Sequence, residues 1–238
     1  MRAERRHESR PASFVPRRLI RAALIDLDGT LLDTAPDLAA AANEALAELG
    51  LAPIEPAAVR EFVGKGIEVL VGRCLESALG RAPDAALCER AQARFAVHYE
   101  RLNGSASRPY AGVVEGLALM RARGLRLACV TNKLARFTRP LLAKTGLAEF
   151  FDAVVTSDTA GARKPDPAIL LHACGLFEVS PAEACVIGDS ANDSLAARAA
   201  GCRFLLVPYG YREGQDLREI DCDRTVATLL EAARVLIE

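Results

Sequence analysis

Residues 21–33, RAALIDLDGTLLD, decide the fold, because an apolar run in this stretch ends abruptly at carboxylates. Residues 22–25 have the length and composition of a strand buried on both faces of a parallel sheet, and turn-forming residues follow them. Asp26 and Asp28 would therefore lie at the carboxyl end of a strand, where open α/β sheets bind their ligands. We expect the chemistry of the protein at this edge of the sheet.

The pair Asp26-x-Asp28 suits the transfer of a phosphoryl group. A carboxylate fixed at a strand end, here Asp26, can attack phosphorus and form an acyl-phosphate. Asp28, turned inward by Gly29, can act as a general acid and then as a general base. Neighbouring carboxylates repel each other unless a cation joins them, and oxygen ligands beside a phosphate favour Mg²⁺. A bare D-x-D is equally compatible with two solvated acids in a turn, but the longer motif through Thr30 favours the phosphate interpretation.

Strands and helices alternate from Pro109 to the end of the chain, which is typical of a parallel sheet with right-handed crossovers. Strands are predicted at residues 125–130, 153–156, 185–188 and 204–207. Helices are predicted at residues 113–123, 135–145, 168–174, 193–200 and about 228–237, with a bend or restart at Pro140 and a stop at Gly175. The pattern predicts an α/β fold, namely a Rossmann-like doubly wound parallel sheet.

Residues 35–107 interrupt this alternation with helices alone. The helices are predicted at residues 35–49, from about residue 56, and at residues 67–79 and 85–102, before a turn-rich link at residues 103–109. We therefore expect a catalytic core of residues 21–34 and 108–238 and an inserted all-helical cap domain of residues 35–107. An arginine-rich tail at residues 1–20 is predicted to be disordered, with a basic interaction arm as the alternative.

The composition is that of a globular protein with no general affinity for polyanions. The 238 residues are 51% hydrophobic and 26% charged, with a net charge of −1. We expect no nucleic-acid partner and no membrane partner, since no apolar run approaches the length of a membrane span. Seven scattered cysteines without a C-x-x-C pair predict buried, reduced thiols and a cytoplasmic location. The oligomeric state is left open between a monomer and a homodimer.

Two further strand ends finish in polar residues and should meet Asp26 at the same edge of the sheet. Thr131 can offer its hydroxyl, and Asn132 its backbone amide, to a phosphate oxygen near the start of a helix. Asp189 can join Asp26 in holding a metal ion together with water and a phosphate oxygen. Thr131 taken alone also suits the N-cap of the following helix.

Lys164 lies in a loop that two prolines stiffen. Transfer of a phosphoryl group to an aspartate needs a cation opposite the crowded oxygens, and Lys164 can supply it. An exposed lysine without a task is the alternative. Ser190 and Asp193 match a capping box, which explains both residues without a catalytic role.

Taken together, these residues resemble the motifs of the haloacid dehalogenase superfamily of phosphohydrolases. The matching segments are 26–30 (DLDGT), 131–132 (TN), 164–165 (KP) and 188–193 (GDSAND). The resemblance covers residue 22 to the C-terminus, and the place of the insertion is similar to that of the small all-helical cap type. Segments 33–37, 62–66 with Leu70, 130–133 and 209–211 further resemble the bacterial phosphoglycolate phosphatases, which hydrolyse 2-phosphoglycolate with magnesium.

The resemblance implies a role for each core motif. It makes Asp26 the nucleophile and a metal ligand, Asp28 the acid/base with its backbone carbonyl on the metal, and Asp189 the remaining protein ligand. The groups implied to hold the phosphate are Thr131, Asn132 and Lys164. The groups implied to orient these residues or a metal-bound water from behind are Asp193, Ser190 and Thr30.

In the cap, the resemblance places Gly64, Lys65 and Gly66 over the site, where a cation or bare amides could bind the carboxylate of the substrate. Lys65 is equally well explained as a solvated loop lysine.

These observations lead us to expect a magnesium-dependent phosphomonoesterase that acts through an aspartyl-phosphate on a small phosphorylated metabolite, with 2-phosphoglycolate as the first candidate. A phosphatase for a sugar phosphate or pyrophosphate and a phosphomutase on the same core stay open. Dehalogenation would leave Asp28 without a task, a phospho-accepting receiver domain needs no inserted cap, and an inert binding protein would be expected to lack at least one of the core residues.

Overall fold

A computed structural model describes residues 19–211 and 214–238. The tail that we predicted to be disordered therefore lies outside the described residues, apart from Leu19 and Ile20. Ile20 is buried and packs in the hydrophobic core, so the ordered core extends at least to this residue. No helix in the described ranges has the length and hydropathy required to span a bilayer.

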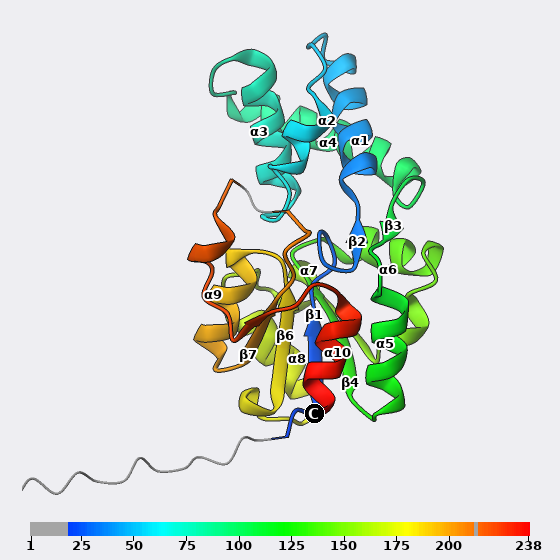
Figure 1. The fold of residues 1–238 in the computed structure, drawn as a ribbon. Helices are drawn as coiled ribbons and strands as arrows, with labels where there is room; N and C mark the ends of the chain where they lie inside the picture. The colour runs from blue at the N-terminus through cyan, green and yellow to red at the C-terminus, as the bar shows by residue number, and fades with distance from the viewer. Residues whose placement is uncertain (1–18, 212–213) are drawn as a thin grey trace, which may run out of the picture.

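A six-stranded parallel sheet forms the centre of the molecule and confirms the predicted fold class (Figure 1). Its spatial order is β5 (Ala153–Thr156), β4 (Arg126–Thr131), β1 (Ala22–Ile25), β6 (Ala184–Gly188), β7 (Arg203–Leu206) and β8 (Arg224–Thr225). Ile25, the last residue of β1, lies opposite Cys129 of β4 and Ile187 of β6. The residues that follow these three strands are therefore level with one another at one edge of the sheet.

Helices cover both faces of the sheet because alternate residues of β1 point to opposite sides. Ala23 and Ile25 pack in one apolar cluster, and Ala22 and Leu24 pack in the other. The helices of the first face are α5 (Val113–Ala122), α6 (Ala135–Lys144) and α10 (Leu229–Ile237), and those of the second are α8 (Ala168–Phe177) and α9 (Ala191–Ala200). The shorter helical segments are α7 (Ser157–Ala160), η1 (Ala148–Phe150), η2 (Pro181–Glu183) and η3 (Leu217–Glu219).

The chain between residues 35 and 102 forms a separate helical layer at one end of the sheet (Figure 1). Its helices are α1 (Ala35–Glu48), α2 (Pro56–Arg60), α3 (Ile67–Leu79) and α4 (Ala85–Leu102), and they share a third apolar cluster. Where the chain enters and leaves this cap, β2 (Leu32–Asp33) pairs antiparallel with β3 (Arg108–Pro109). We did not predict β2 and β3 because two residues are too few to show a strand pattern.

Asp37, in the first turn of α1, fastens the chain that returns from the cap to the core. Its buried carboxylate accepts hydrogen bonds from the backbone amides of Gly104, Ala106 and Ser107 at 2.8–3.0 Å, and from the Ser107 hydroxyl at 2.5 Å. One side chain therefore satisfies three backbone donors of an otherwise irregular link, which ties the two crossings between cap and core together.

Replacing Asp37 should weaken the fold strongly for a single substitution. Asp37→Ala is expected to lower the free energy of unfolding by about 3 kcal/mol, because buried amides would lose their acceptor. This corresponds to a fall of about 6–12 °C in the melting temperature measured by scanning calorimetry. The matched control is Asp84→Ala, which removes an exposed N-cap side chain that accepts a hydrogen bond from the Leu87 amide. This substitution should lower the free energy of unfolding by about 1 kcal/mol. Equal losses in the two variants would contradict this role of Asp37.

Three local predictions were wrong. Helix α8 does not stop before Gly175 but continues to Phe177, because the buried Phe177 ring anchors a last turn that ends at Glu178 with φ 53°. Helix α6 runs without interruption through Pro140, so the restart, one of the two predicted alternatives, does not occur. Thr131 is the last residue of β4, and the N-cap of α6 is Leu134, so the N-cap interpretation of Thr131 fails.

Candidate active site

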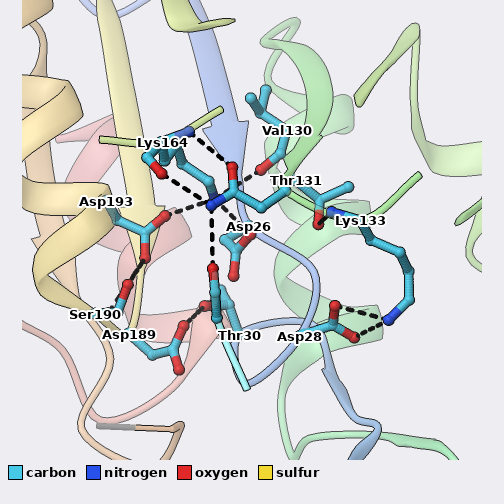
Figure 2. Close-up of polar contacts among 12 residues, drawn as sticks. Asp26, Asp28, Thr30, Val130, Thr131, Lys133, Lys164, Asp189, Ser190 and Asp193 are labelled. Atoms are coloured by element: carbon cyan, nitrogen blue, oxygen red, sulfur yellow. Dashed lines mark hydrogen bonds and ion pairs between the residues drawn. The ribbon is translucent and has the colours of Figure 1, made fainter. Parts of the chain in front are cut away.

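The side chain of Lys164 reaches the carboxyl end of β1 and binds there (Figure 2). Its Nζ donates hydrogen bonds to Asp26 Oδ1 at 2.5 Å, to Asp193 Oδ1 at 2.7 Å and to the Val130 carbonyl at 2.9 Å. Lys164 is 4% exposed, so its interpretation as an exposed lysine is wrong. Burial opposes its charge, but Asp193 and Asp26 raise the pKa of Lys164 above its ordinary value, and the group stays an ammonium.

Asn132 holds the loop of Lys164 in place. Its Oδ1 accepts a hydrogen bond from the Lys164 amide at 2.7 Å, and its Nδ2 donates to the Lys164 carbonyl at 3.0 Å. The same Nδ2 also donates to the Gly64 carbonyl in the cap at 3.0 Å. The side chain is therefore occupied in positioning, which leaves to its backbone amide the phosphate contact that we expected. Beside it, Thr131 Oγ1 accepts from the Lys133 amide at 3.1 Å, so its own O–H can still donate to a phosphate oxygen.

Ser190 and Asp193 form the predicted capping box at the start of α9. Asp193 Oδ2 accepts hydrogen bonds from the Ser190 amide at 3.2 Å and hydroxyl at 2.7 Å, while its Oδ1 holds Lys164. Asp193 thus completes the capping box and orients Lys164 at the same time. Gly188 precedes this turn without a side chain, because a Cβ there would lie 2.3 Å from Asp193 Cγ.

Asp189 follows β6 and is fixed on both of its oxygens. Oδ1 accepts from the Thr30 hydroxyl at 2.9 Å, and Oδ2 accepts from the Tyr211 amide at 2.6 Å. A Cβ at Gly29 or Gly210 would come within 2.2 Å of Oδ2, so both glycines are needed for the backbone to approach this carboxylate. Thr30 therefore lies where we expected an orienting group, and Tyr211 is a further one to which we had assigned no role.

The buried carboxylates fit a divalent cation. Asp26, Asp189 and Asp193 each offer an oxygen within 4.8 Å of the others. Burial, opposed by Lys164, raises the pKa of Asp26 to about 7, and burial together with the charge of Asp26 raises that of Asp189 well above its ordinary value. These carboxylates are poorly stabilised as anions by the protein alone, which is the situation that a bound cation corrects.

The side chain of Asp28 points away from this group and toward Lys133 (Figure 2). Lys133 Nζ donates to Asp28 Oδ1 at 2.7 Å and Oδ2 at 2.8 Å, and the Thr34 hydroxyl donates to Oδ1 at 2.6 Å. Lys133 is 6% exposed, and although burial opposes its charge, Asp28 raises the pKa of Lys133 above its ordinary value. We missed Lys133 as a site residue; its place directly after Thr131 and Asn132 was the available signal.

A cavity between the cap and the core opens onto these groups. Its residues from the core are Asp26, Asp28, Thr131, Asn132 and Lys133, and its residues from the cap are Leu38, Val63, Gly64, Gly66, Ile67 and Leu70. Gly64 and Gly66, which we expected over the site, line this cavity, whereas Lys65 is not among its lining residues.

Comparison with known proteins agrees with this geometry. The profile of the haloacid dehalogenase-like hydrolases matches residues 23–207. The phosphoglycolate phosphatase of Nitrosospira multiformis is 51% identical over 217 residues, which cover 91% of this chain and 96% of that protein. The phosphoglycolate phosphatase of Thiobacillus denitrificans is 50% identical over 214 residues, covering 90% and 94% of the two chains.

Among solved structures, the crystal structure of a predicted phosphoglycolate phosphatase from Haemophilus somnus 129PT matches with a TM-score of 0.86 and 29% identity. The match covers 91% of this chain and 97% of that one. The profile match spans all of the motif residues at the edge of the sheet. The chain belongs to the haloacid dehalogenase-like hydrolase family.

Proposed function

We propose that this protein is a magnesium-dependent phosphomonoesterase that hydrolyses 2-phosphoglycolate to glycolate and phosphate through an aspartyl-phosphate on Asp26. The observation that carries the proposal is the arrangement around Asp26: Lys164 lies against its Oδ1, and Asp26, Asp28 and Lys164 line one pocket. A nucleophile, a cation for the transferred group and an acid/base thus surround one space. The relatives named phosphoglycolate phosphatase support the choice of substrate.

The first half-reaction would begin with the phosphate of the substrate against Thr131, the Asn132 amide and Lys164. Because Lys164 occupies Oδ1 of Asp26, Oδ2 is the oxygen free to attack phosphorus. The bond between phosphorus and the bridging oxygen then breaks, and Asp28 protonates that oxygen to release glycolate. Lys164 opposes the charge on the transferred oxygens throughout.

In the second half-reaction Asp28 takes a proton from water, which attacks the phosphorus of the aspartyl-phosphate. The acyl-phosphate bond breaks, phosphate leaves, and Asp26 is regenerated as a carboxylate. A magnesium ion held by Asp26 and Asp189 would supply charge neutralisation for the crowded anions at this edge.

The proposal is tested by measuring inorganic phosphate release from a panel of phosphate esters with MgCl₂ and with EDTA. The panel should contain 2-phosphoglycolate, a hexose phosphate, pyrophosphate and p-nitrophenyl phosphate. We expect the highest kcat/KM with 2-phosphoglycolate and almost no release in EDTA. A higher kcat/KM with the sugar phosphate or pyrophosphate would show that 2-phosphoglycolate is not the preferred substrate. Conversion of a sugar phosphate into its isomer without phosphate release would indicate a mutase.

Magnesium should stabilise the protein more as the pH rises. The folded-state pKa of Asp26, about 7, lies above that of an ordinary carboxyl group, so proton binding by Asp26 favours the folded state. Without the ion, this stabilisation is fully present below about pH 4 and is lost as the pH rises through about 7. The rise in melting temperature on adding saturating MgCl₂ should therefore grow between pH 5 and pH 8, reaching about 5 °C or more. Scanning fluorimetry in MgCl₂, with NaCl of equal ionic strength as control, tests this, and a rise that shrinks with pH would contradict it.

A further inference from the structure

Lys133 is a buried cation for which the proposed chemistry has no use. The sequence contains only four lysines, and two of them, Lys133 and Lys164, are buried at this site. Lys164 serves Asp26, whereas Lys133 is directed at Asp28. The Nζ of Lys133 also lies over the face of the Tyr99 ring, 5.1 Å from its centre, in a cation–π contact. The protein thus keeps a second ammonium beside the acid/base, although only Lys164 touches the nucleophile.

The position of Lys133 relative to Asp28 defines what it can reach. An acid/base acts only on an oxygen within hydrogen-bond distance, so the leaving oxygen must come within about 3 Å of Asp28. In 2-phosphoglycolate the carboxylate carbon is two bonds from that oxygen. Lys133 Nζ lies 2.7 and 2.8 Å from the two oxygens of Asp28, so the carboxylate arrives within reach of this ammonium.

The other buried cation of the site, Lys164, lines the adjoining pocket and is held by Asp26 and Asp193, so it is not available to the carboxylate. Among the described residues that line the cavity between cap and core, Lys133 carries the only positive charge. The cap contributes the apolar side chains of Leu38, Val63, Ile67 and Leu70, together with two glycines. Asp26 and Asp28 would repel a second anion in this space, so an anionic leaving group needs Lys133 to enter.

We infer that Lys133 is the residue that recognises the carboxylate of the substrate, exchanging hydrogen bonds to Asp28 for hydrogen bonds to the bound carboxylate. This inference rests on the proposed function and adds a specificity residue to it. The exchange also turns one oxygen of Asp28 free toward the leaving oxygen, so an anionic leaving group both fits the cavity and prepares the acid/base. A neutral leaving group would leave Lys133 on Asp28. Lys133 therefore selects for small phosphate esters with an anionic group two bonds beyond the bridging oxygen.

The test compares two substrates of nearly equal size, 2-phosphoglycolate and 2-hydroxyethyl phosphate, in which an alcohol replaces the carboxylate. The measured quantity is the ratio of their kcat/KM values. In Lys133→Met this ratio should fall by about 100-fold or more, almost entirely through the loss of activity on 2-phosphoglycolate. Methionine keeps the length of the side chain and can pack on the Tyr99 ring. Inhibition by inorganic phosphate should change little, because Lys133 is not placed on the phosphate.

Several outcomes would overturn the inference. If Lys133→Met keeps the wild-type ratio of kcat/KM values, Lys133 does not recognise the carboxylate. If Lys133→Met loses activity equally on both substrates, Lys133 only supports Asp28. The matched control Lys144→Met removes a lysine that binds the Asn103 carbonyl and does not line this cavity, and it should keep the wild-type ratio. Collapse of the ratio in Lys65→Met instead would assign recognition to the cap loop. If Lys133→Met does not fold, Lys133→Gln takes its place with the same expected loss of the ratio.

Failure of the proposed function looks different. The wild-type enzyme would then release no phosphate from 2-phosphoglycolate, and the inference would fall with it. If the wild-type enzyme hydrolyses 2-phosphoglycolate efficiently and Lys133→Met retains the preference for it, the function stands and the role of Lys133 is refuted.

Discussion

Asp26→Asn is expected to lower kcat for phosphate release by at least about 10⁴-fold while leaving the protein folded. An amide oxygen is a much weaker nucleophile than a carboxylate, and the other carboxylate held against Lys164 has both of its oxygens engaged. Asp193 lines a pocket together with Asp26, Asp28 and Lys164, but its Oδ1 accepts from Lys164 and its Oδ2 accepts from the amide and hydroxyl of Ser190. No substitute nucleophile is therefore available at the end of β1.

The fold should tolerate this substitution because asparagine has the same shape as aspartate. Its carbonyl oxygen can still accept a hydrogen bond from Lys164 Nζ, which also keeps Asp193 and the Val130 carbonyl as partners. Burial already disfavours the anionic form of Asp26, as its pKa of about 7 indicates, so loss of the charge removes little stabilisation. We expect a melting temperature within about 3 °C of wild type.

Steady-state phosphate release and scanning calorimetry on the same preparation test both halves of this prediction. The matched control is Asp84→Asn, which makes the same chemical change at an exposed N-cap where asparagine serves as well as aspartate. Its turnover and stability should equal those of wild type. Turnover of Asp26→Asn close to wild type would refute the assignment of the nucleophile.

The core of this site could be predicted because it depends on where strands end. The apolar run before Asp26 and the runs before Thr131 and Asp189 each predicted a buried strand, and parallel strands bring their carboxyl ends to one edge. The sheet order, with β1 between β4 and β6, then places the three ends side by side. Backbone topology alone was enough for these positions.

The parts that could not be predicted depend on where side chains point. Nothing in the sequence shows that the Asn132 side chain binds the Lys164 loop and the Gly64 carbonyl, or that Lys133 points toward Asp28. The cap loop offered Lys65 as the visible cation for a carboxylate, yet the cavity is lined by its glycine neighbours and by Lys133. Such choices are made by tertiary packing, for which local sequence patterns carry no signal.

Two residues connect the cap and the start of the cap to the charged groups of the site. Tyr211 donates its amide to Asp189, and its hydroxyl donates to Asp33 at 2.7 Å and accepts from the amides of Thr34 and Ala35 at 2.7 and 2.9 Å. One residue therefore links the Asp189 carboxylate to the strand where the chain enters the cap. Asn132 makes the corresponding link on the other side, from the Lys164 loop to Gly64. Tyr211 and Asn132 thus each contact both the charged groups and the cap or its entry strand.

Asp28→Asn is expected to lower kcat on 2-phosphoglycolate by about 10²- to 10⁴-fold, because the proposed mechanism uses Asp28 as the acid of the first step and the base of the second. Asparagine can still accept hydrogen bonds from Lys133 and Thr34 on one oxygen, so the variant should fold.

The two roles of Asp28 separate with p-nitrophenyl phosphate, whose leaving group departs without a proton. With this substrate the first step in Asp28→Asn should stay fast while hydrolysis of the aspartyl-phosphate stays slow. A burst of p-nitrophenol equal to the enzyme concentration should therefore precede a slow steady state, and the protein should gain the mass of one phosphoryl group. Stopped-flow absorbance and intact-protein mass spectrometry measure these two quantities, with Asp84→Asn as the control that shows no such accumulation. A burst is required only if Asp28 activates the water, so slow turnover of p-nitrophenyl phosphate without any burst would show that Asp28 has no role in the second step. An unchanged kcat on 2-phosphoglycolate would show that Asp28 has no role in the first step.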